Sequence, residues 1–332
     1  MKIALLVGGP SPERSISKQS SKAIYNALIN LQHEVKLIDP AYGKNQPKNI
    51  HQFFDDVDFT EVSEANLISC FDSNLFEGID LVFIGLHGKW GEDGVIQSLL
   101  ELKKLKYTGA GVLSSAISMD KNASKIYMQH HGIKTPDWIF LQNQNYKSDQ
   151  VKDKITNLFG FPCVVKPNDQ GSTIGLTVCD EESDLEESLN LAFRFSRSVL
   201  VEEYIYGREI TVGILNGEPL PVLEIIPRSG LYDFKAKYTD GESEYIVPAQ
   251  IETNLAESVK EAAIKTYNVL GCSDYGRVDF KLDSKNVFFC LELNTLPGMT
   301  SHSLVPKEAK VLGITFDNLI ERIISSALSN EK

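Results

Sequence analysis

Long apolar stretches are missing from this sequence. No run approaches the roughly 18 apolar residues that a membrane helix needs. The longest run near the start, Ile3–Val7, is too short for the core of a signal peptide. We therefore expect a cytoplasmic protein that has no membrane among its partners.

Cysteine and positive charge are also scarce. The five cysteines stand apart, at positions 70, 163, 179, 272 and 290, and form no C-x-x-C pair, so we expect buried, reduced thiols. Lysine and arginine number 33 against 45 for aspartate and glutamate, which gives a formal net charge of −12. This acidity argues against a nucleic acid as a partner, although a few well-placed lysines can still bind a small anion.

Two common nucleotide-binding motifs are absent. The loop Gly8–Ser17 does not fit G-x-G-x-x-G, which disfavours a dinucleotide site. The loop Lys166–Gly175 lacks the spacing G-x-x-x-x-G-K-[ST] and is therefore not a P-loop. A nucleotide bound by this chain needs other groups.

What is present first indicates a parallel α/β unit. Strands are expected at Lys2–Val7, Glu34–Ile38 and Asp80–Leu86, with a helix over Ser17–Leu31 between the first two. The polar stretch Ala41–Phe76 is expected to be a loose insertion with short helical pieces. Open sheets of this kind bind ligands at the carboxyl ends of their strands.

The remaining pattern predicts smaller α+β units. Helices are expected at Val95–Leu105, Asn122–His130, Ser183–Phe193 and Ala256–Leu270, and strands at Cys163–Lys166, Leu176–Val178, Leu200–Glu203, Glu209–Leu215 and Leu220–Ile226. A hairpin pairs Arg277–Leu282 with Val287–Asn294. We expect three domains, at residues 1–117, 118–206 and 207–332, the last carrying a mobile loop at 229–245.

The hairpin is the most informative segment. Alternation along the first strand places Arg277 and Asp279 on one face, and in the returning strand Glu292 and Asn294 face the same way, with Leu291 and Leu293 on the apolar side. Two carboxylates and a carboxamide are oxygen ligands of the kind that Mg²⁺ takes next to nucleotide phosphates. The alternative is a solvated sheet face with a surface ion pair.

Four other places in the chain carry candidate groups. In Lys166–Gly175, a strand delivers a lysine and the following loop offers backbone N–H groups and hydroxyls, which suit a polyphosphate, although such turns are also common without a ligand. The strand end Val201–Glu209 can offer main-chain groups to an adenine and a carboxylate to a ribose, or it is simply an acidic strand end. Glu13 can meet a substrate ammonium or merely favour a helix N-terminus. His87, at the end of the third strand, is equally a site residue or a structural histidine.

In this order, these segments resemble the D-alanine–D-alanine ligase family of the ATP-grasp superfamily. The similarity covers the chain except for Ala41–Phe76, and the most specific motif is Glu292-Leu293-Asn294-Thr295-Leu296-Pro297-Gly298-Met299-Thr300, followed by Ser301–Pro306. It implies an ATP-grasp fold of mixed α/β and α+β class, with a parallel α/β N-terminal domain. It also implies ATP-dependent joining of two D-alanine molecules for peptidoglycan precursors, and a homodimer.

The resemblance also implies roles for single residues. ATP, the co-substrate, would be bound by Lys121, Lys166, Ser172, Thr173, Glu202, Tyr204, Ile205, Glu209 and Lys237. Two Mg²⁺ ions, with Mn²⁺ as an alternative, would be held by Asp279, Glu292 and Asn294. The substrates would meet Glu13, His87, Gly298, Ser303 and Leu304, and the catalytic set would be Glu13, Ser172, Tyr238, Arg277 and Ser303. Thr173 stands where the family usually has serine, and it keeps the hydroxyl.

Three alternatives stay open. A related ligase for another carboxylate would keep the nucleotide and metal residues but not the substrate-side segments around Glu13 and Ser303. A ligase that makes the D-lactate or D-serine product would differ around Tyr238. A non-catalytic nucleotide-binding protein would have no use for Arg277 beside the metal ligands.

Overall fold

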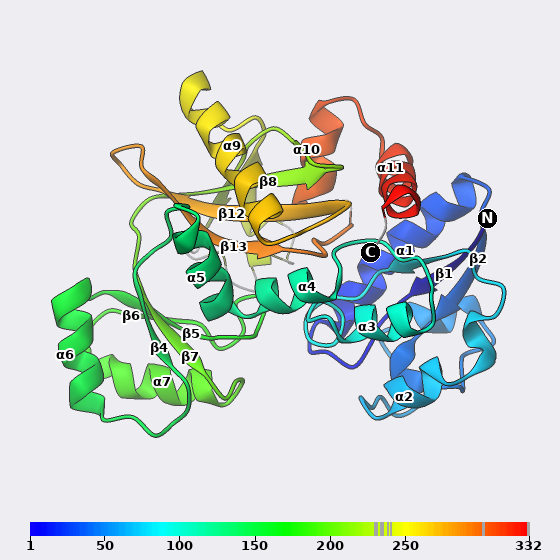
Figure 1. Ribbon diagram of the computed structural model, residues 1–332, viewed down its shortest axis with the longest axis horizontal. Helices are drawn as coiled ribbons and strands as arrows, with labels where there is room; N and C mark the ends of the chain where they lie inside the picture. Colours follow the sequence, from blue (N-terminus) through cyan, green and yellow to red (C-terminus); the bar gives the residue numbers. More distant parts are fainter. Residues whose placement is uncertain (229–231, 233–235, 238, 240, 301–302, 331–332) are drawn as a thin grey trace.

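The computed structural model describes residues 1–228, 232, 236, 237, 239, 241–300 and 303–330. Within them, the strands form three separate sheets of three, four and six strands. Figure 1 shows the three-stranded sheet at one end, beneath α1 and α11, and the other two sheets toward the opposite end. The site lies where these units meet.

The first sheet is parallel, as predicted. Its order is β2 (Glu34–Ile38), β1 (Lys2–Leu6) and β3 (Leu81–Ile84), and both pairings of β1 are parallel. The side chains of Ile3 to Leu6 are fully buried, because both faces of a parallel sheet are covered. The helix α1 (Arg14–Asn30) begins three residues earlier than expected, which brings Glu13 to its first turn.

Short elements lie between β2 and β3 and after β3. The insertion holds only short helical pieces, as expected: η1 (Pro40–Tyr42), η2 (Ile50–Phe53), α2 (Asn66–Phe71) and η3 (Asn74–Phe76). Two further helices follow β3, α3 (Val95–Leu102) and α4 (Val112–Met119). The second of these was not predicted.

The second sheet is antiparallel, with the order β4 (Trp138–Leu141), β7 (Val199–Glu203), β5 (Cys163–Pro167) and β6 (Thr177–Cys179). Its helices are α5 (Lys121–His130), α6 (Ser148–Leu158) and α7 (Leu185–Phe193), the last preceded by η4 (Glu182–Asp184). A separate apolar core joins Ile139, Ile155, Val165 and Leu189. β4 and α6 had no counterpart in the sequence prediction.

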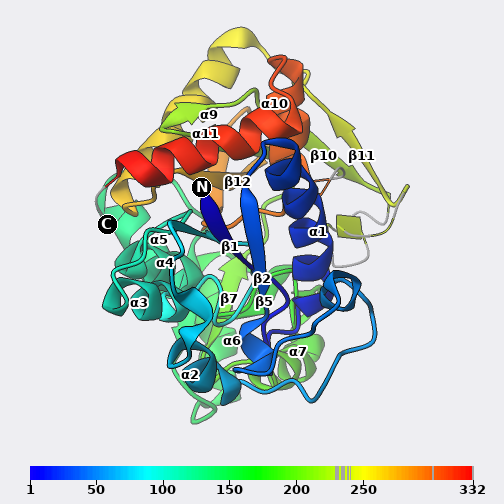
Figure 2. The same ribbon diagram turned by 90° about the vertical axis from the view of Figure 1, so that its right-hand side faces the viewer.

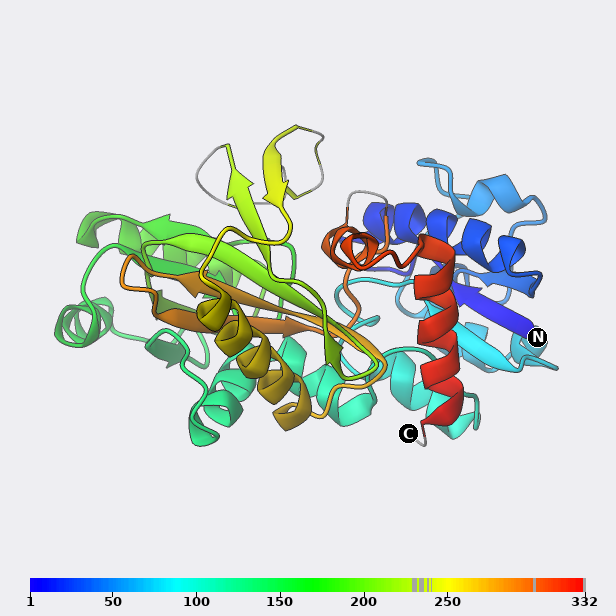
Figure 3. The ribbon, with the colours of Figure 1, turned by 90° about the horizontal axis from the view of Figure 1, so that it is seen from above.

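The third sheet carries the predicted hairpin. Its main path runs β11 (Ser243–Ile246), β10 (Leu223–Pro227), β8 (Arg208–Leu215), β12 (Tyr275–Leu282) and β13 (Phe288–Asn294), and β9 (Glu218–Pro219) pairs with β8. The helix α9 (Thr253–Val269) packs on this sheet. Figure 3 shows α9 along one face of β12 and β13.

Two helices end the chain, α10 (Leu304–Val311) and α11 (Phe316–Ser329). Leu319, Ile320 and Ile323 of α11 belong to the same buried cluster as the strand β1, and Figure 2 shows α11 lying across the upper end of α1. The last helix of the sequence thus covers the first sheet. The same cluster includes Tyr275 of β12 and Leu296, which follows β13, so it also joins the third sheet to the first.

Two expectations about the whole chain can be compared with the structure. All five cysteines are free and buried, as expected. Among the described residues, no helix is both long and apolar enough to cross a membrane.

Candidate active site

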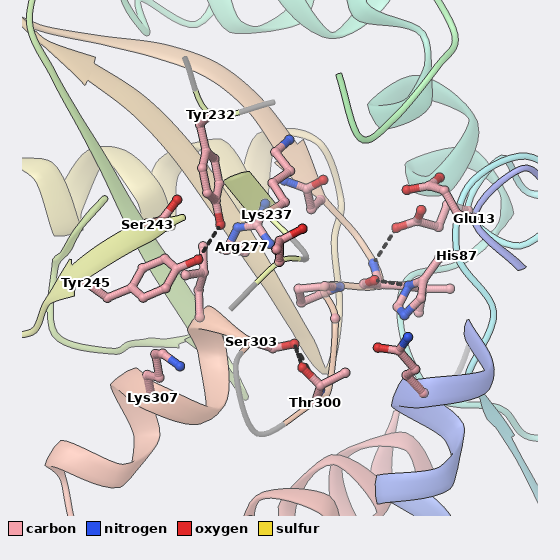
Figure 4. Close-up of a pocket in the computed structure, with 18 of the residues that line it drawn as sticks. Glu13, His87, Tyr232, Lys237, Ser243, Tyr245, Arg277, Thr300, Ser303 and Lys307 are labelled. Atoms are coloured by element: carbon pink, nitrogen blue, oxygen red, sulfur yellow. Dashed lines mark hydrogen bonds between the residues drawn. The ribbon is translucent and has the colours of Figure 1, made fainter. Parts of the chain in front are cut away.

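Two adjoining pockets lie between the sheets. The first, named here the Arg277 pocket, is bordered by Glu13, His87, Arg277, Asn294 and Ser303. The second, the Lys166 pocket, is bordered by Lys121, Lys166, Glu202, Glu209 and Glu292. Tyr232 and Lys237 border both. Figure 4 shows Tyr232, Lys237 and Arg277 facing Glu13 and His87 across the first pocket.

The hairpin brings the predicted polar groups together. Asp279 pairs with Glu292 and Arg277 with Asn294 in the antiparallel register, so the predicted opposition is confirmed. Arg277 donates from Nε to Asp279 Oδ1 at 2.8 Å and from Nη2 to Oδ2 at 2.7 Å. Asn294 Nδ2 donates to Oδ2 at 2.9 Å and Thr211 Oγ1 to Oδ1 at 2.6 Å.

One residue of the hairpin is not where alternation places it. The register shifts between Asp279 and Phe280, because Asp279 pairs with Glu292 and Phe280 with Cys290. Leu291 is therefore the extra residue of a bulge, and it borders the Lys166 pocket next to Glu292. The prediction that Leu291 shares the apolar face with Leu293 is wrong. Its apolar side chain instead forms part of the pocket wall.

Glu292 lies in a strongly positive surrounding. Lys121 Nζ is 3.3 Å from Glu292 Oε2. Burial opposes its ionisation, yet Lys121, Lys237, Lys166 and Arg277 together lower the pKa of Glu292 to about 2. The carboxylate is thus charged throughout the physiological pH range and can ligate a cation.

The Lys166 pocket is built from the end of β5 and the loop after it. Ser172 and Thr173 both have positive φ, 49° and 63°, so the loop curls back over the pocket. Thr173 Oγ1 donates to the backbone oxygen of Tyr232 at 3.1 Å. Lys166 Nζ donates to Glu202 Oε1 at 2.9 Å.

The other residues predicted for ATP also border this pocket. Tyr204, Ile205 and Glu209 line it, and Ile205 is buried. Lys281 Nζ is 3.2 Å from Glu209 Oε2. Burial raises the pKa of Glu209, against the opposing effect of Lys281 and Lys237.

Glu13 links the N-terminal sheet to the glycine loop. It immediately precedes α1 and is 5% exposed. The hydroxyl of Ser172, which is distant in sequence, donates to Glu13 Oε1. Burial raises the pKa of Glu13, while Ser172, Lys237 and Lys121 act in the opposite direction. This hydrogen bond joins two members of the expected catalytic set. Tyr238, which belongs to the same expected set, lies outside the described residues.

His87 is held by two hydrogen bonds at the inner end of the pocket. Its Nδ1 lies 3.0 Å from the Leu296 backbone oxygen and its Nε2 2.9 Å from Ser20 Oγ. A carbonyl oxygen only accepts, so Nδ1 carries the proton and Nε2 accepts from the serine. Burial lowers the pKa of His87 to about 4. The imidazole is therefore neutral. Its two hydrogen bonds connect Ser20 of α1 to Leu296 in the segment after β13.

The remaining substrate-side residues lie at the start of α10. Ser303 precedes the helix, and its Oγ accepts from Thr300 N at 2.9 Å. A Cβ on Gly298 would come within 2.9 Å of that hydroxyl, so a larger residue there would shift the Ser303 hydroxyl. Leu304 borders the pocket. The free N–H groups of a helix start, with a hydroxyl beside them, suit a carboxylate.

Several pocket residues were not predicted. Glu92 borders the Arg277 pocket and accepts backbone hydrogen bonds from Gly88 and Leu296. Gln19 and Lys307 also border the pocket, and they gave no local signal. Of the predicted loop 229–245, the described residues Tyr232, Lys237 and Ser243 face this pocket.

A hairpin that bears two carboxylates and a carboxamide, and a lysine-bearing glycine loop between two antiparallel sheets, define an ATP-grasp enzyme. Comparisons with known proteins give the family. The D-ala D-ala ligase N-terminus model matches residues 2–110 and the D-ala D-ala ligase C-terminus model matches residues 127–325. The chain therefore belongs to the D-alanine–D-alanine ligase family.

Individual relatives match over nearly their full length. The D-alanine–D-alanine ligase of Syntrophotalea carbinolica is 39% identical over 326 residues, covering 98% of this chain and 96% of the relative. That of Pelotomaculum thermopropionicum is 39% identical, covering 99% and 98%. A crystal structure of the Bacillus anthracis D-alanine–D-alanine ligase complexed with ATP superposes with a TM-score of 0.79 at 32% identity, covering 99% and 97%.

Proposed function

We propose that this enzyme uses ATP to join two D-alanine molecules into D-alanyl-D-alanine, releasing ADP and phosphate, as a step in peptidoglycan precursor synthesis. The observation that carries the proposal is the pair of adjoining pockets. The Lys166 pocket places the lysine side chains Lys121 and Lys166 beside a glycine-containing loop. The Arg277 pocket brings together Glu13, Arg277 and the start of α10. Family membership over the whole chain supports the same activity.

ATP binding is assigned to the Lys166 pocket. Lys121 and Lys166 offer positive charge. The loop 168–175 offers backbone N–H groups, and two of its residues, Ser172 and Thr173, have the left-handed backbone conformation. This combination suits a polyphosphate. Tyr204, Ile205 and Leu291 give the apolar walls that a base requires. The Bacillus anthracis relative, solved with ATP, supports this assignment.

The residues of the hairpin fit Mg²⁺. Glu292 is ionised, and because Asn294 Nδ2 donates to Asp279, its amide oxygen is left for a cation. Asp279 fits if Arg277 releases one of its oxygens. Three side-chain ligands are too few for two octahedral ions, so nucleotide oxygens would complete them. When bound, Mg²⁺ would neutralise charge on the phosphates.

The substrates are assigned to the Arg277 pocket. The Glu13 carboxylate suits the ammonium of the first D-alanine, and the Ser303 hydroxyl with the N–H groups of α10 suits the carboxylate of the second. Figure 4 shows Arg277 across the pocket from Glu13 and above Ser303 in that view. Its guanidinium can stabilise an oxyanion that forms there.

The reaction then proceeds in two balanced steps. The carboxylate of the first D-alanine attacks the γ-phosphorus of ATP, giving an acyl phosphate and ADP. Lys121 and Lys166 balance the charge of the transferring group. The neutral amine of the second D-alanine attacks the acyl carbon, a tetrahedral intermediate forms next to Arg277, and phosphate leaves as the amine gives up its proton. Because acyl phosphates hydrolyse, the closed pocket must exclude water.

We further infer that the reaction takes place in the cytoplasm and that the working form is a homodimer. Exposed apolar side chains gather on consecutive helices, Leu102 on α3, Leu113 on α4 and Tyr127 on α5, which supports a covered surface there. Light scattering on the purified protein tests the dimer. A monomer at micromolar concentration would contradict it.

The function itself is tested by product identification. Purified protein with ATP, Mg²⁺ and D-alanine should form a dipeptide of the mass of alanylalanine, with one phosphate released per dipeptide. Phosphate release that needs no D-alanine, or that yields no dipeptide, would contradict the proposal.

A further inference from the structure

A buried lysine lies directly behind the Lys166 pocket. Lys125 is on α5, one turn after Lys121, and its side chain is 0% exposed. Its Nζ donates to Thr135 Oγ1 at 2.7 Å and to the Pro136 backbone oxygen at 3.0 Å. It also lies 2.8 Å from Glu202 Oε2. Lys125 is not among the residues that border the pocket, so it does not reach a ligand there.

Glu202 stands between this lysine and Lys166. Its Oε2 meets Lys125 and its Oε1 meets Lys166 at 2.9 Å, so one carboxylate is shared by two ammonium groups. Burial opposes ionisation of Glu202, but Lys125 and Lys166 lower its pKa. Burial in turn lowers the pKa of Lys125, and Glu202 counteracts this effect. The three groups therefore form a charged unit with a net charge of +1.

We propose that Lys125 is a positioning residue for ATP: it neutralises Glu202, so that Lys166 keeps a full positive charge for the phosphates. Glu202 also fixes the direction of the Lys166 side chain through the 2.9 Å hydrogen bond. This inference depends on the proposed binding of ATP at Lys166. Lys125 would act on ATP binding through Glu202 and Lys166, without touching the nucleotide itself.

The charges predict what loss of Lys125 does. Without it, the buried Glu202 carboxylate is balanced by Lys166 alone, and the net charge of the unit falls from +1 to 0. A buried charge without a second partner also draws Lys166 away from the pocket. Binding of a polyphosphate should weaken, while binding of a neutral nucleoside should change little.

The test compares two variants by calorimetric titration with ADP and with adenosine. Lys125→Met should weaken ADP by about tenfold or more and adenosine by less than about threefold. Lys125→Arg keeps a positive charge beside Glu202. Its ADP affinity should stay within about threefold of that of the natural protein.

A matched control is Lys152→Met. Lys152 forms an ion pair with Glu182 at 3.2 Å, on the surface beside the same four-stranded sheet. Its loss should leave ADP affinity unchanged. A folded Lys125→Arg variant that binds ADP as weakly as Lys125→Met would overturn the proposal, and so would equal weakening of ADP and adenosine in Lys125→Met. Should Lys125→Met fail to fold, Lys125→Gln takes its place with the same expected loss, because it removes the charge but keeps a donor for Thr135 and Pro136. Failure of the natural protein to bind ADP would contradict the proposed function instead.

Discussion

The guanidinium of Arg277 holds both carboxylate oxygens of Asp279, at 2.8 and 2.7 Å. Asp279 also accepts hydrogen bonds from Thr211 and Asn294, so the four acceptor positions of its carboxylate are all used. A cation that binds Asp279 must therefore displace one of these donors, and we expect it to displace Arg277, because Arg277 is itself positively charged. The displaced guanidinium then becomes available to the reacting carbonyl.

This competition predicts opposite effects of Arg277→Met on metal binding and on catalysis. Mn²⁺ binding in the presence of ADP, followed by electron paramagnetic resonance, should become tighter, because a competing cation is gone. The kcat should fall by about 10²–10³, the usual loss for a group that stabilises an oxyanion. Weaker Mn²⁺ binding in the variant would show that Arg277 supports the ion instead of competing with it.

Glu292→Gln should abolish most turnover and leave the fold intact. The natural carboxylate is ionised, with a pKa of about 2, and a neutral amide removes one negative charge from the predicted metal ligands. We expect a fall in phosphate release of about 10²-fold or more at ordinary magnesium concentration. Circular dichroism is the control for folding. Near-normal turnover would remove Glu292 from the metal ligands.

Lys166→Ala should separate phosphate binding from base binding. Lys166 faces the pocket from the end of β5 and is fixed by Glu202. Its loss should weaken ATP and ADP by about tenfold or more and leave adenosine nearly unchanged. Equal weakening of all three ligands, measured by titration calorimetry, would mean that the lysine only supports the fold.

Glu92 predicts a pH-dependent stability. Burial and the nearby Glu13 raise its pKa to about 8, so the folded state holds a proton that the unfolded state loses near pH 4.5. Stability from this group is present below pH 4.5 and is lost progressively as the pH rises to about 8. Glu92→Gln lacks this titration. Its melting temperature minus that of the natural protein should therefore rise between pH 5 and pH 9.

The matched control for this measurement is Glu64→Gln, at an exposed position of the insertion. Its melting temperature should differ from that of the natural protein by the same amount at every pH. A Glu92→Gln difference that stays flat, or that falls with rising pH, would show that the Glu92 carboxyl is ionised in the folded protein.

Much of the site could be predicted from the sequence because it follows from alternation. The opposition of Asp279 and Glu292 needs only the period of a strand and a short turn, and both are local properties. The bulge at Leu291 is different. A single extra residue changes which side chain faces the pocket, and nothing in the local pattern marks it.

Other features depend on contacts between distant parts of the chain. Lys125 looks like a solvated lysine on a helix, and only the packing of α5 against β7 shows that Glu202 needs it. The role of α11 as a cover for β1 joins the two ends of the sequence. Glu92 is marked as a site residue only by its burial next to Glu13. These relationships are tertiary, so sequence periodicity cannot reveal them.

The most direct test of the central claim is a competition between equal amounts of D-alanine and D-lactate, at pH 7–8, with ATP, Mg²⁺ and products separated by mass. Parallel reactions with L-alanine and with other D-amino acids check the substrate. Glu13 offers a carboxylate to the first ammonium, and Tyr238 brings no positive charge to repel the second. We predict that D-alanyl-D-alanine is the main product, that L-alanine gives no phosphate release above background and that D-lactate is used poorly. A predominant depsipeptide, or equal turnover with L-alanine, would contradict the account.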